Sequence, residues 1–144
     1  MLMDALAQIE ASGLMRGLRT SFAVYPLVSA AHIAGFATMF GAIITYDLSV
    51  LRGSWRGLSD PARRIAAVGA VVAITTGLIL FLARGTSYAA NPAFQIKALL
   101  LTLALANVAR AHLDQRPDTA RATALASIIL WTGVLIAGRY IAFL

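Results

Sequence analysis

Four long apolar runs dominate this chain, and short polar segments separate them. The runs extend over about 22–46, 65–83, 94–112 and 122–144. A helix needs about 20 mostly apolar residues, each rising about 1.5 Å, to cross the hydrocarbon core of a bilayer. The third run reaches this length only if Arg110 and His112 lie at the membrane interface. The pattern therefore predicts four membrane-spanning helices.

The segments between the runs contain residues that break helices, namely Gly53, Gly57 and Pro61, then Gly85, Asn91 and Pro92, and finally Pro117. Short connections place successive helices antiparallel to one another. We therefore expect residues 22–144 to form an all-α transmembrane domain, an up-down-up-down four-helix bundle. Small residues at i and i+4, Ala31 with Gly35 and Ala37 with Gly41, predict close packing of the first helix on its neighbours.

Residues 1–21 show a different pattern, in which apolar side chains fall near one helical face and polar ones near the other. The apolar positions are Leu2, Leu6, Ile9, Leu14 and Leu18, and the polar ones are Asp4, Gln8, Glu10, Arg16 and Arg19. This arrangement predicts an amphipathic helix that lies on the membrane interface. It is not typical of a secretory signal, because charges interrupt the apolar residues.

The composition agrees with a membrane protein. Hydrophobic residues make up 60% of the chain and charged residues 12%, whereas soluble domains are about 45–50% apolar and about 25% charged. The chain has no cysteine, which excludes disulfides and thiolate metal sites. Its net charge is +6, yet the basic residues are scattered, so nucleic-acid binding is not indicated.

Arginine and lysine are unevenly shared between the two sides of the predicted bundle. One side has Arg52, Arg56, Arg63, Arg64, Arg110, Arg116 and Arg121, and the other has Arg16, Arg19, Arg84, Lys97 and Arg139. Loops on the cytoplasmic side of a membrane carry an excess of these residues. The distribution therefore favours an orientation with both termini outside.

Ionisable residues inside the predicted spans form two layers, and the outer layer contains His32, Lys97 and Arg139. Charged groups at the bilayer centre cost about 2.5–3.5 kcal/mol on insertion scales, so each is a candidate functional residue. A histidine deeper than two cations suits a haem whose propionates point to the surface. Alternatively, Lys97 and Arg139 reach the headgroups and His32 makes an interhelical hydrogen bond.

The inner layer contains Asp47, with Arg110 and Arg63 as candidate partners. We expect a structural ion pair between Asp47 and one of these arginines, because a partner offsets the cost of a carboxylate at the membrane edge. The same group would also serve as the inner end of a proton or ion path. His112 also lies in this layer, about 20 Å along the axis from His32, so the two are not expected to bind one haem within a single chain.

Several short motifs resemble a family of uncharacterised four-span bacterial membrane proteins. The resemblance covers nearly all of the chain after residue 20. It implies a multi-pass protein of the bacterial inner membrane, in which the charge pattern places both termini in the periplasm. The motifs are His32-Ile-Ala-Gly35, Gly41, Asp47-Leu-Ser-Val-Leu-Arg52, Thr76-Gly77-Leu-Ile-Leu-Phe81, Asn91-Pro-Ala-Phe-Gln-Ile-Lys97 and Gly138-Arg139-Tyr-Ile-Ala142.

A more distant resemblance joins the chain to the J-type protoporphyrinogen oxidases and the copper-resistance protein D family. It rests on a histidine in the first helix, a lysine that opens the third and a histidine that closes it. The resemblance implies that His32 is an axial ligand of haem b and that Lys97 binds a substrate or a propionate. Tyr46-Asp47-Leu48 replaces the Leu-Pro-Arg-Leu segment of the oxidases, so the resemblance does not extend to their activity.

The sequence leaves more than one class of function open, and it does not decide whether the chain is an enzyme. The first is a redox protein that binds haem b or another tetrapyrrole through His32, Lys97 and Arg139 and exchanges electrons with a quinone or a periplasmic partner. The second is a non-catalytic accessory or scaffolding subunit of a homo-oligomer or larger membrane complex. Copper or proton transport is a further alternative, although copper sites usually recruit several His, Met or Cys ligands.

Overall fold

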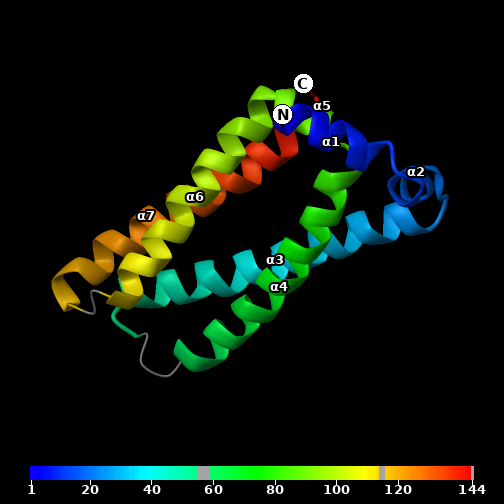
Figure 1. Cartoon of the computed structure of the whole chain (residues 1–144). Coiled ribbons are helices and arrows are strands. Elements are labelled where there is room, and N and C mark those ends of the chain that lie inside the picture. Colours follow the sequence, from blue (N-terminus) through cyan, green and yellow to red (C-terminus); the bar gives the residue numbers. More distant parts are fainter. Residues whose placement is uncertain (55–58, 114–115, 144) are drawn as a thin grey trace.

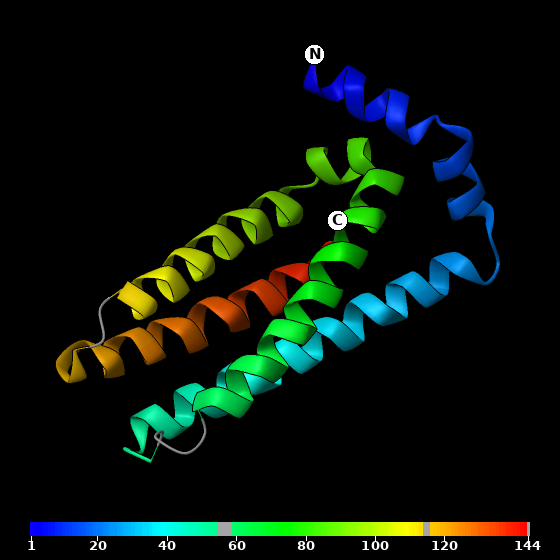
Figure 2. The ribbon, with the colours of Figure 1, turned by 60° about the horizontal axis from the view of Figure 1, so that its bottom comes forward.

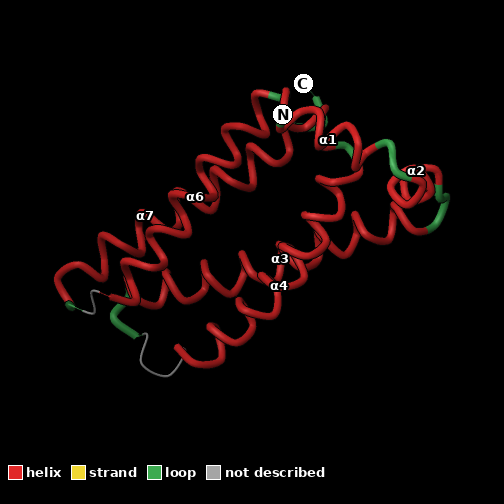
Figure 3. Tube along the Cα trace, in the orientation of Figure 1, coloured by secondary structure: helices red, strands yellow, loops and turns green. Residues whose placement is uncertain are grey.

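The computed structural model describes residues 1–54, 59–113 and 116–143, and every regular element within these ranges is a helix (Figures 1 and 3). Four helices are long and apolar enough to cross a membrane, in agreement with the predicted number of spans. They are α3 (Val24–Leu51), α4 (Ser59–Ala83), α6 (Pro92–Leu113) and α7 (Pro117–Tyr140), and the short helices are α1 (Leu2–Glu10), α2 (Gly13–Thr20) and α5 (Gly85–Ala90). The sequence-predicted positions Arg56, Gly57 and Leu144 lie outside the described residues.

The bounds of the long helices differ from the predicted ones. α3 continues beyond residue 46 to Leu51, and α4 and α7 begin several residues before the predicted 65 and 122. The apolar pattern misses these turns because polar side chains at the aqueous ends of a helix interrupt hydrophobicity without interrupting the backbone. Gly53 then ends α3 with a left-handed φ of 74°, as its N–H donates to the Val50 carbonyl at 3.1 Å.

The amino-terminal segment forms two helices rather than one. The chain turns at Ala11 and Ser12, where the Ser12 hydroxyl accepts a hydrogen bond from the Met15 N–H at 3.3 Å and caps α2. A similar cap begins α6, because the Asn91 side chain accepts from the Ala93 N–H at 2.9 Å. These short polar side chains fix where the helices begin.

The four long helices pack in a row, in the order α4, α3, α7 and α6. Within the described ranges the backbone of α4 lies apart from those of α6 and α7 (Figure 2). Side chains still join α4 to α6, because Phe81 stacks on Phe94 with 5.3 Å between the ring centres. The end of α3, the start of α4, the end of α6 and the start of α7 lie together at one end of the molecule (Figures 1 and 2). Both termini, α1, α2 and α5 lie at the other end.

The closest approach of two helices is between α3 and α4. A Cβ atom on Gly69 would lie 2.5 Å from the Met39 backbone nitrogen and 2.7 Å from the Gly35 carbonyl oxygen. The two backbones therefore touch with no room for a side chain, as expected for small residues at a membrane helix crossing. Gly41, which shares the same sequence spacing, has nothing within 4 Å of a Cβ.

The core of the molecule is small and lies between α3, α6 and α7. It contains Met39, Ala104, Trp131 and Val134, with partly buried apolar side chains around them. Most other apolar side chains of the long helices face outward; Ile129, for example, is 70% exposed. Such a surface is stable in a lipid environment, which supports contact with a bilayer.

Candidate functional site

His32 lies on α3 and points at α4. Its Nδ1 atom is 2.9 Å from the Ala73 carbonyl oxygen and 3.3 Å from the Thr76 hydroxyl. The Thr76 hydroxyl donates its hydrogen to the Val72 carbonyl, and a carbonyl oxygen can only accept. Both oxygens near Nδ1 are therefore acceptors, so Nδ1 carries a hydrogen and donates it. The Nε2 atom is then the ring nitrogen with a free lone pair.

Glycine makes the room for this imidazole. A Cβ atom on Gly77 would lie 2.8 Å from His32 Cε1 and 3.2 Å from Nδ1. The ring is half-buried between the two helices. The hydrogen bond to α4 therefore fixes both the tautomer and the orientation of the ring.

Lys97 lies in the second turn of α6, where its side chain is half-buried and passes over Gly138 of α7. A Cβ atom on Gly138 would lie 3.5 Å from the lysine Nζ. Lys97 is close enough to His32 for the two to interact electrostatically. It has neither a hydrogen-bond partner nor a carboxylate partner in the part of the chain that the structure describes.

Arg139 follows Gly138 directly but points elsewhere. Its side chain is exposed, and its guanidinium carbon lies 4.7 Å from the centre of the Phe143 ring, a cation–π contact. Of the three residues predicted for the outer layer, His32 lies between α3 and α4, Lys97 lies against Gly138 of α7, and Arg139 is exposed on the surface.

The inner layer is arranged differently from the predicted ion pair. Arg110 donates to the Thr123 hydroxyl at 3.1 Å, and Arg63 contacts His112 Nε2 at 3.4 Å. No salt bridge joins Asp47 to either arginine among the described residues. The reason is the order of the helices, because α7 separates α6 from α3 and offers Thr123 to Arg110 first.

Asp47 is 6% exposed and faces α7, where the Ser127 side chain lies beside its carboxyl group. The Oδ2 atom of this carboxyl has no hydrogen-bond partner. A buried polar atom without a partner is rare and calls for an explanation.

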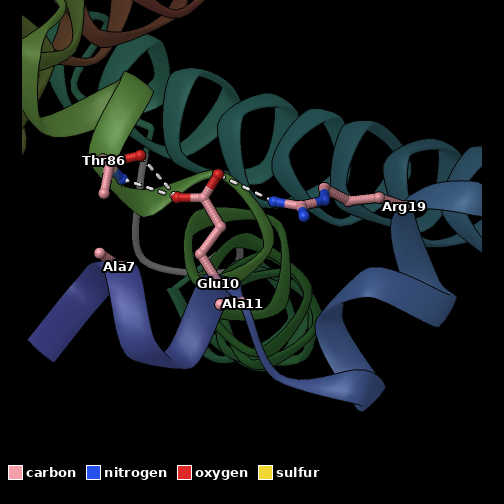
Figure 4. A pocket seen from close by; sticks show the side chains of 5 residues that line it. All are labelled: Ala7, Glu10, Ala11, Arg19 and Thr86. Carbon is pink, nitrogen blue, oxygen red and sulfur yellow. Dashed lines mark hydrogen bonds and ion pairs between the residues drawn. The ribbon is translucent and has the colours of Figure 1, made fainter.

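A polar cluster that the sequence did not predict attaches α1 and α2 to the start of α5 (Figure 4). The Glu10 carboxylate accepts from the Thr86 hydroxyl at 2.6 Å, the Thr86 N–H at 3.2 Å and the Arg19 guanidinium at 2.8 Å. The same Arg19 nitrogen donates to the Ala83 carbonyl at 2.9 Å. These donors, Thr86 first, hold the pKa of Glu10 below its ordinary value.

The cluster borders a surface pocket of about 290 Å³, which Ala7 and Ala11 also line. Glu10 and Arg19 were assigned from the sequence only to the polar face of an amphipathic helix. Their partner Thr86 is 76 positions away from Glu10 in the chain. Nothing in the local pattern around Thr86 indicates the contact.

No three His, Cys, Asp or Glu side chains come together as a metal site in the described ranges. A haem would need only an axial ligand from the chain. Comparison of the chain with known protein families, with curated proteins and with solved structures finds no match.

Proposed function

We propose that the protein crosses the bacterial inner membrane four times in an up-down-up-down course, with both termini in the periplasm. The positions of the helix ends and the excess of arginine around the first and third connections support this topology. In this orientation α1, α2 and α5 lie at the periplasmic interface. The exposed apolar side chains Ile9 and Leu14 can then rest against the membrane surface, whereas Leu6 is buried against Gly85 of α5.

Within this frame we propose that the protein binds haem b, or a related tetrapyrrole, with His32 as the axial ligand. The observation that carries the proposal is the hydrogen bond from His32 Nδ1 to the Ala73 carbonyl. Histidines that ligate a metal typically donate their other ring N–H to a carbonyl or carboxylate, which fixes the tautomer and leaves Nε2 for the metal. Gly77 lets the imidazole lie directly against the backbone of α4, which holds the ring in this orientation.

The ammonium group of Lys97, unpaired among the described residues, also favours haem as the ligand. A cation within a span is costly unless it is paired, and the described part of the chain supplies no carboxylate for it. A propionate group would satisfy this ammonium from outside the chain. Arg139 is the cation available for a second propionate near the membrane surface.

When bound, a haem would supply one-electron redox chemistry at this depth of the membrane. The chain would contribute the axial imidazole, the tautomer set by Ala73, and the cation that holds a propionate. Its partner in electron transfer would be a quinone or a periplasmic redox protein.

The test is a titration of the full-length protein in detergent with haemin, followed by its Soret absorption. We expect a complex with the wild-type chain that is lost in His32→Gln. Glutamine can still donate to the Ala73 carbonyl, so this variant removes the ligand while keeping the interhelical hydrogen bond. His112→Gln is the matched control and should bind haemin as the wild type does. His112 lies near the end of α6, whereas Lys97 lies near its start.

Lys97→Met should weaken haemin binding by about 10- to 100-fold, because a hydrogen bond to a charged group contributes about 1.5–3 kcal/mol. Lys97→Arg should restore most of the affinity. An unchanged Soret band in His32→Gln, or no band with the folded wild type, would contradict the proposal.

The alternative of an accessory subunit rests on a different observation. α4 and α6 are the outer helices of the row, and large apolar side chains such as Val71 at 65% and Leu99 at 61% exposure point away from the chain. A larger membrane assembly would cover such faces. Stable purification of a colourless protein with a larger assembly would favour this function over haem binding.

A further inference from the structure

A buried polar layer connects α3 and α7 at the end of the molecule away from the haem site. Asp47, Thr123 and Ser127 are 6%, 8% and 5% exposed, respectively. The Ser127 hydroxyl lies beside the Asp47 carboxyl, and the Oδ2 atom of that carboxyl has no hydrogen-bond partner. One turn further along α7, the buried Trp131 indole nitrogen also lacks a partner.

No described cationic side chain forms a salt bridge with Asp47. The described charged side chains of α3, α4, α6 and α7 near this end of the molecule are exposed, and Tyr46 is the neighbouring titratable group on α3 itself. The charged set is Arg52, Asp60, Arg63, Arg64, Arg110, Arg116 and Arg121, and His112 is the exposed titratable group at the end of α6. Among the described residues, salt bridges occur only within the amino-terminal segment.

An ionised carboxylate in this position would be strongly disfavoured. Burial of an unpaired charge in an apolar medium costs far more than burial of a neutral acid. Asp47 also lies about 6 Å along the axis from the end of α3. The partial negative charge at a helix carboxyl terminus disfavours a further anion there.

Residues with hydroxyl groups recur along α7 between its first turn and the level of Asp47. Thr119, Thr123 and Ser127 follow one another at intervals of four residues, so they share one face at steps of about 6 Å. Arg110 donates to the Thr123 hydroxyl at 3.1 Å, and that hydroxyl donates to the Thr119 carbonyl at 2.9 Å. We refer to these three residues as the hydroxyl ladder.

We propose that Asp47 is a membrane-embedded proton-binding site, held as a neutral acid and supplied with protons along the hydroxyl ladder. The ligand is a proton rather than a metal cation. A single carboxyl with a serine hydroxyl gives few oxygen ligands, and an ion such as Na⁺ or Ca²⁺ requires several. The site is separate from His32 and stands whether or not the protein binds haem.

The first test measures the protonation state directly. Full-length protein with ¹³C in the aspartate side-chain carboxyl groups is titrated with acid and base in detergent and followed by NMR. We expect one resonance to keep the neutral-acid position at neutral pH, and Asp47→Asn to remove it. The resonance of the exposed Asp4 should have moved to the carboxylate position at the same pH.

Ser127→Ala provides a second assignment that keeps the carboxyl in place. The loss of a hydroxyl donor disfavours the anion, so the Asp47 resonance should titrate at higher pH than in the wild type. Ionised Asp47 at neutral pH would overturn the proposal. Displacement of the proton by added Na⁺ at constant pH would overturn it too and would assign a cation site.

The second test addresses the ladder, using the infrared shift of the acid carbonyl band when the solvent is changed to D₂O. Thr123→Val removes one hydroxyl at constant shape and should slow this exchange several-fold. Thr102→Val is the matched control, because Thr102 is an exposed threonine of α6 that donates to the Ala98 carbonyl. Equal exchange rates in the two variants would eliminate the ladder as the route.

Discussion

At the scale of single residues, Glu10 determines whether α1 and α2 stay attached to the rest of the molecule. Its pKa lies below the ordinary value of 4.5 because Thr86 and Arg19 stabilise the carboxylate. The ionised Glu10 carboxylate therefore contributes fully to attachment above pH 4.5. This contribution is lost as the pH falls through the lower pKa that Glu10 has in the attached state. We predict that acidification below about pH 4.5 releases the segment.

Spin labels at two exposed positions, Met3→Cys and Ser87→Cys, would follow this release as an increase in their distance. The chain has no cysteine of its own, so the labels report only these sites. Glu10→Gln should release the segment already at neutral pH. Asp4→Asn is the control, since Asp4 is highly exposed and pairs only with the amino terminus; equal behaviour of the two variants would contradict the prediction.

At the scale of helices, the crossing of α3 and α4 depends on Gly69. We predict that Gly69→Ala forces the helices apart and destabilises the protein by about 1–3 kcal/mol, the usual cost of overpacking. A Cβ there would overlap backbone atoms of α3, which cannot rotate away. Gly41→Ala, on the same helix pair but with open space around its Cβ, should leave stability nearly unchanged.

Unfolding of both variants by increasing sodium dodecyl sulfate, followed by tryptophan fluorescence, would measure the difference. Gly69→Ala should also weaken haemin binding, because the same crossing holds His32 against the Ala73 carbonyl. Equal stability of the two glycine variants would show that the helices tolerate separation at this point.

The glycines also show how far the sequence determines the arrangement of these helices. The length of the apolar runs was sufficient to predict four spans, because a bilayer sets a minimum length. The spacing of small residues predicts close helix packing at both Gly35 and Gly41. The structure shows close packing at Gly35 but open space at Gly41. Spacing defines a face of a helix, but it does not decide which neighbour that face meets.

The same limit applies to the candidate sites. The depth of His32 and Lys97 could be estimated by counting residues along each helix, and both lie at the same end of the molecule. The partner of Asp47 could not be predicted, because it depends on α7 being placed between α3 and α6. Ser127 is a short polar residue in an apolar helix, and it gives no signal of its contact until the helices are adjacent.

At the scale of the whole molecule, the even number of spans requires both termini to lie on one side of the membrane. Single cysteines at Met3, Ser54 and Phe143, all exposed, would test this with a membrane-impermeant maleimide. Cysteines at 3 and 143 should react in intact spheroplasts, because we place both termini in the periplasm. A cysteine at Ser54, just beyond the end of α3, should react only after the membrane is permeabilised.

The pattern of labelling separates the topology from the orientation. Reaction at Ser54→Cys but at neither terminus would reverse the orientation and keep the four crossings. The proton site at Asp47 would then receive its protons from the periplasm, and the haem site would face the cytoplasm. Reaction at one terminus only would require an odd number of crossings and contradict the up-down-up-down course itself, because the described helices connect the termini through four spans.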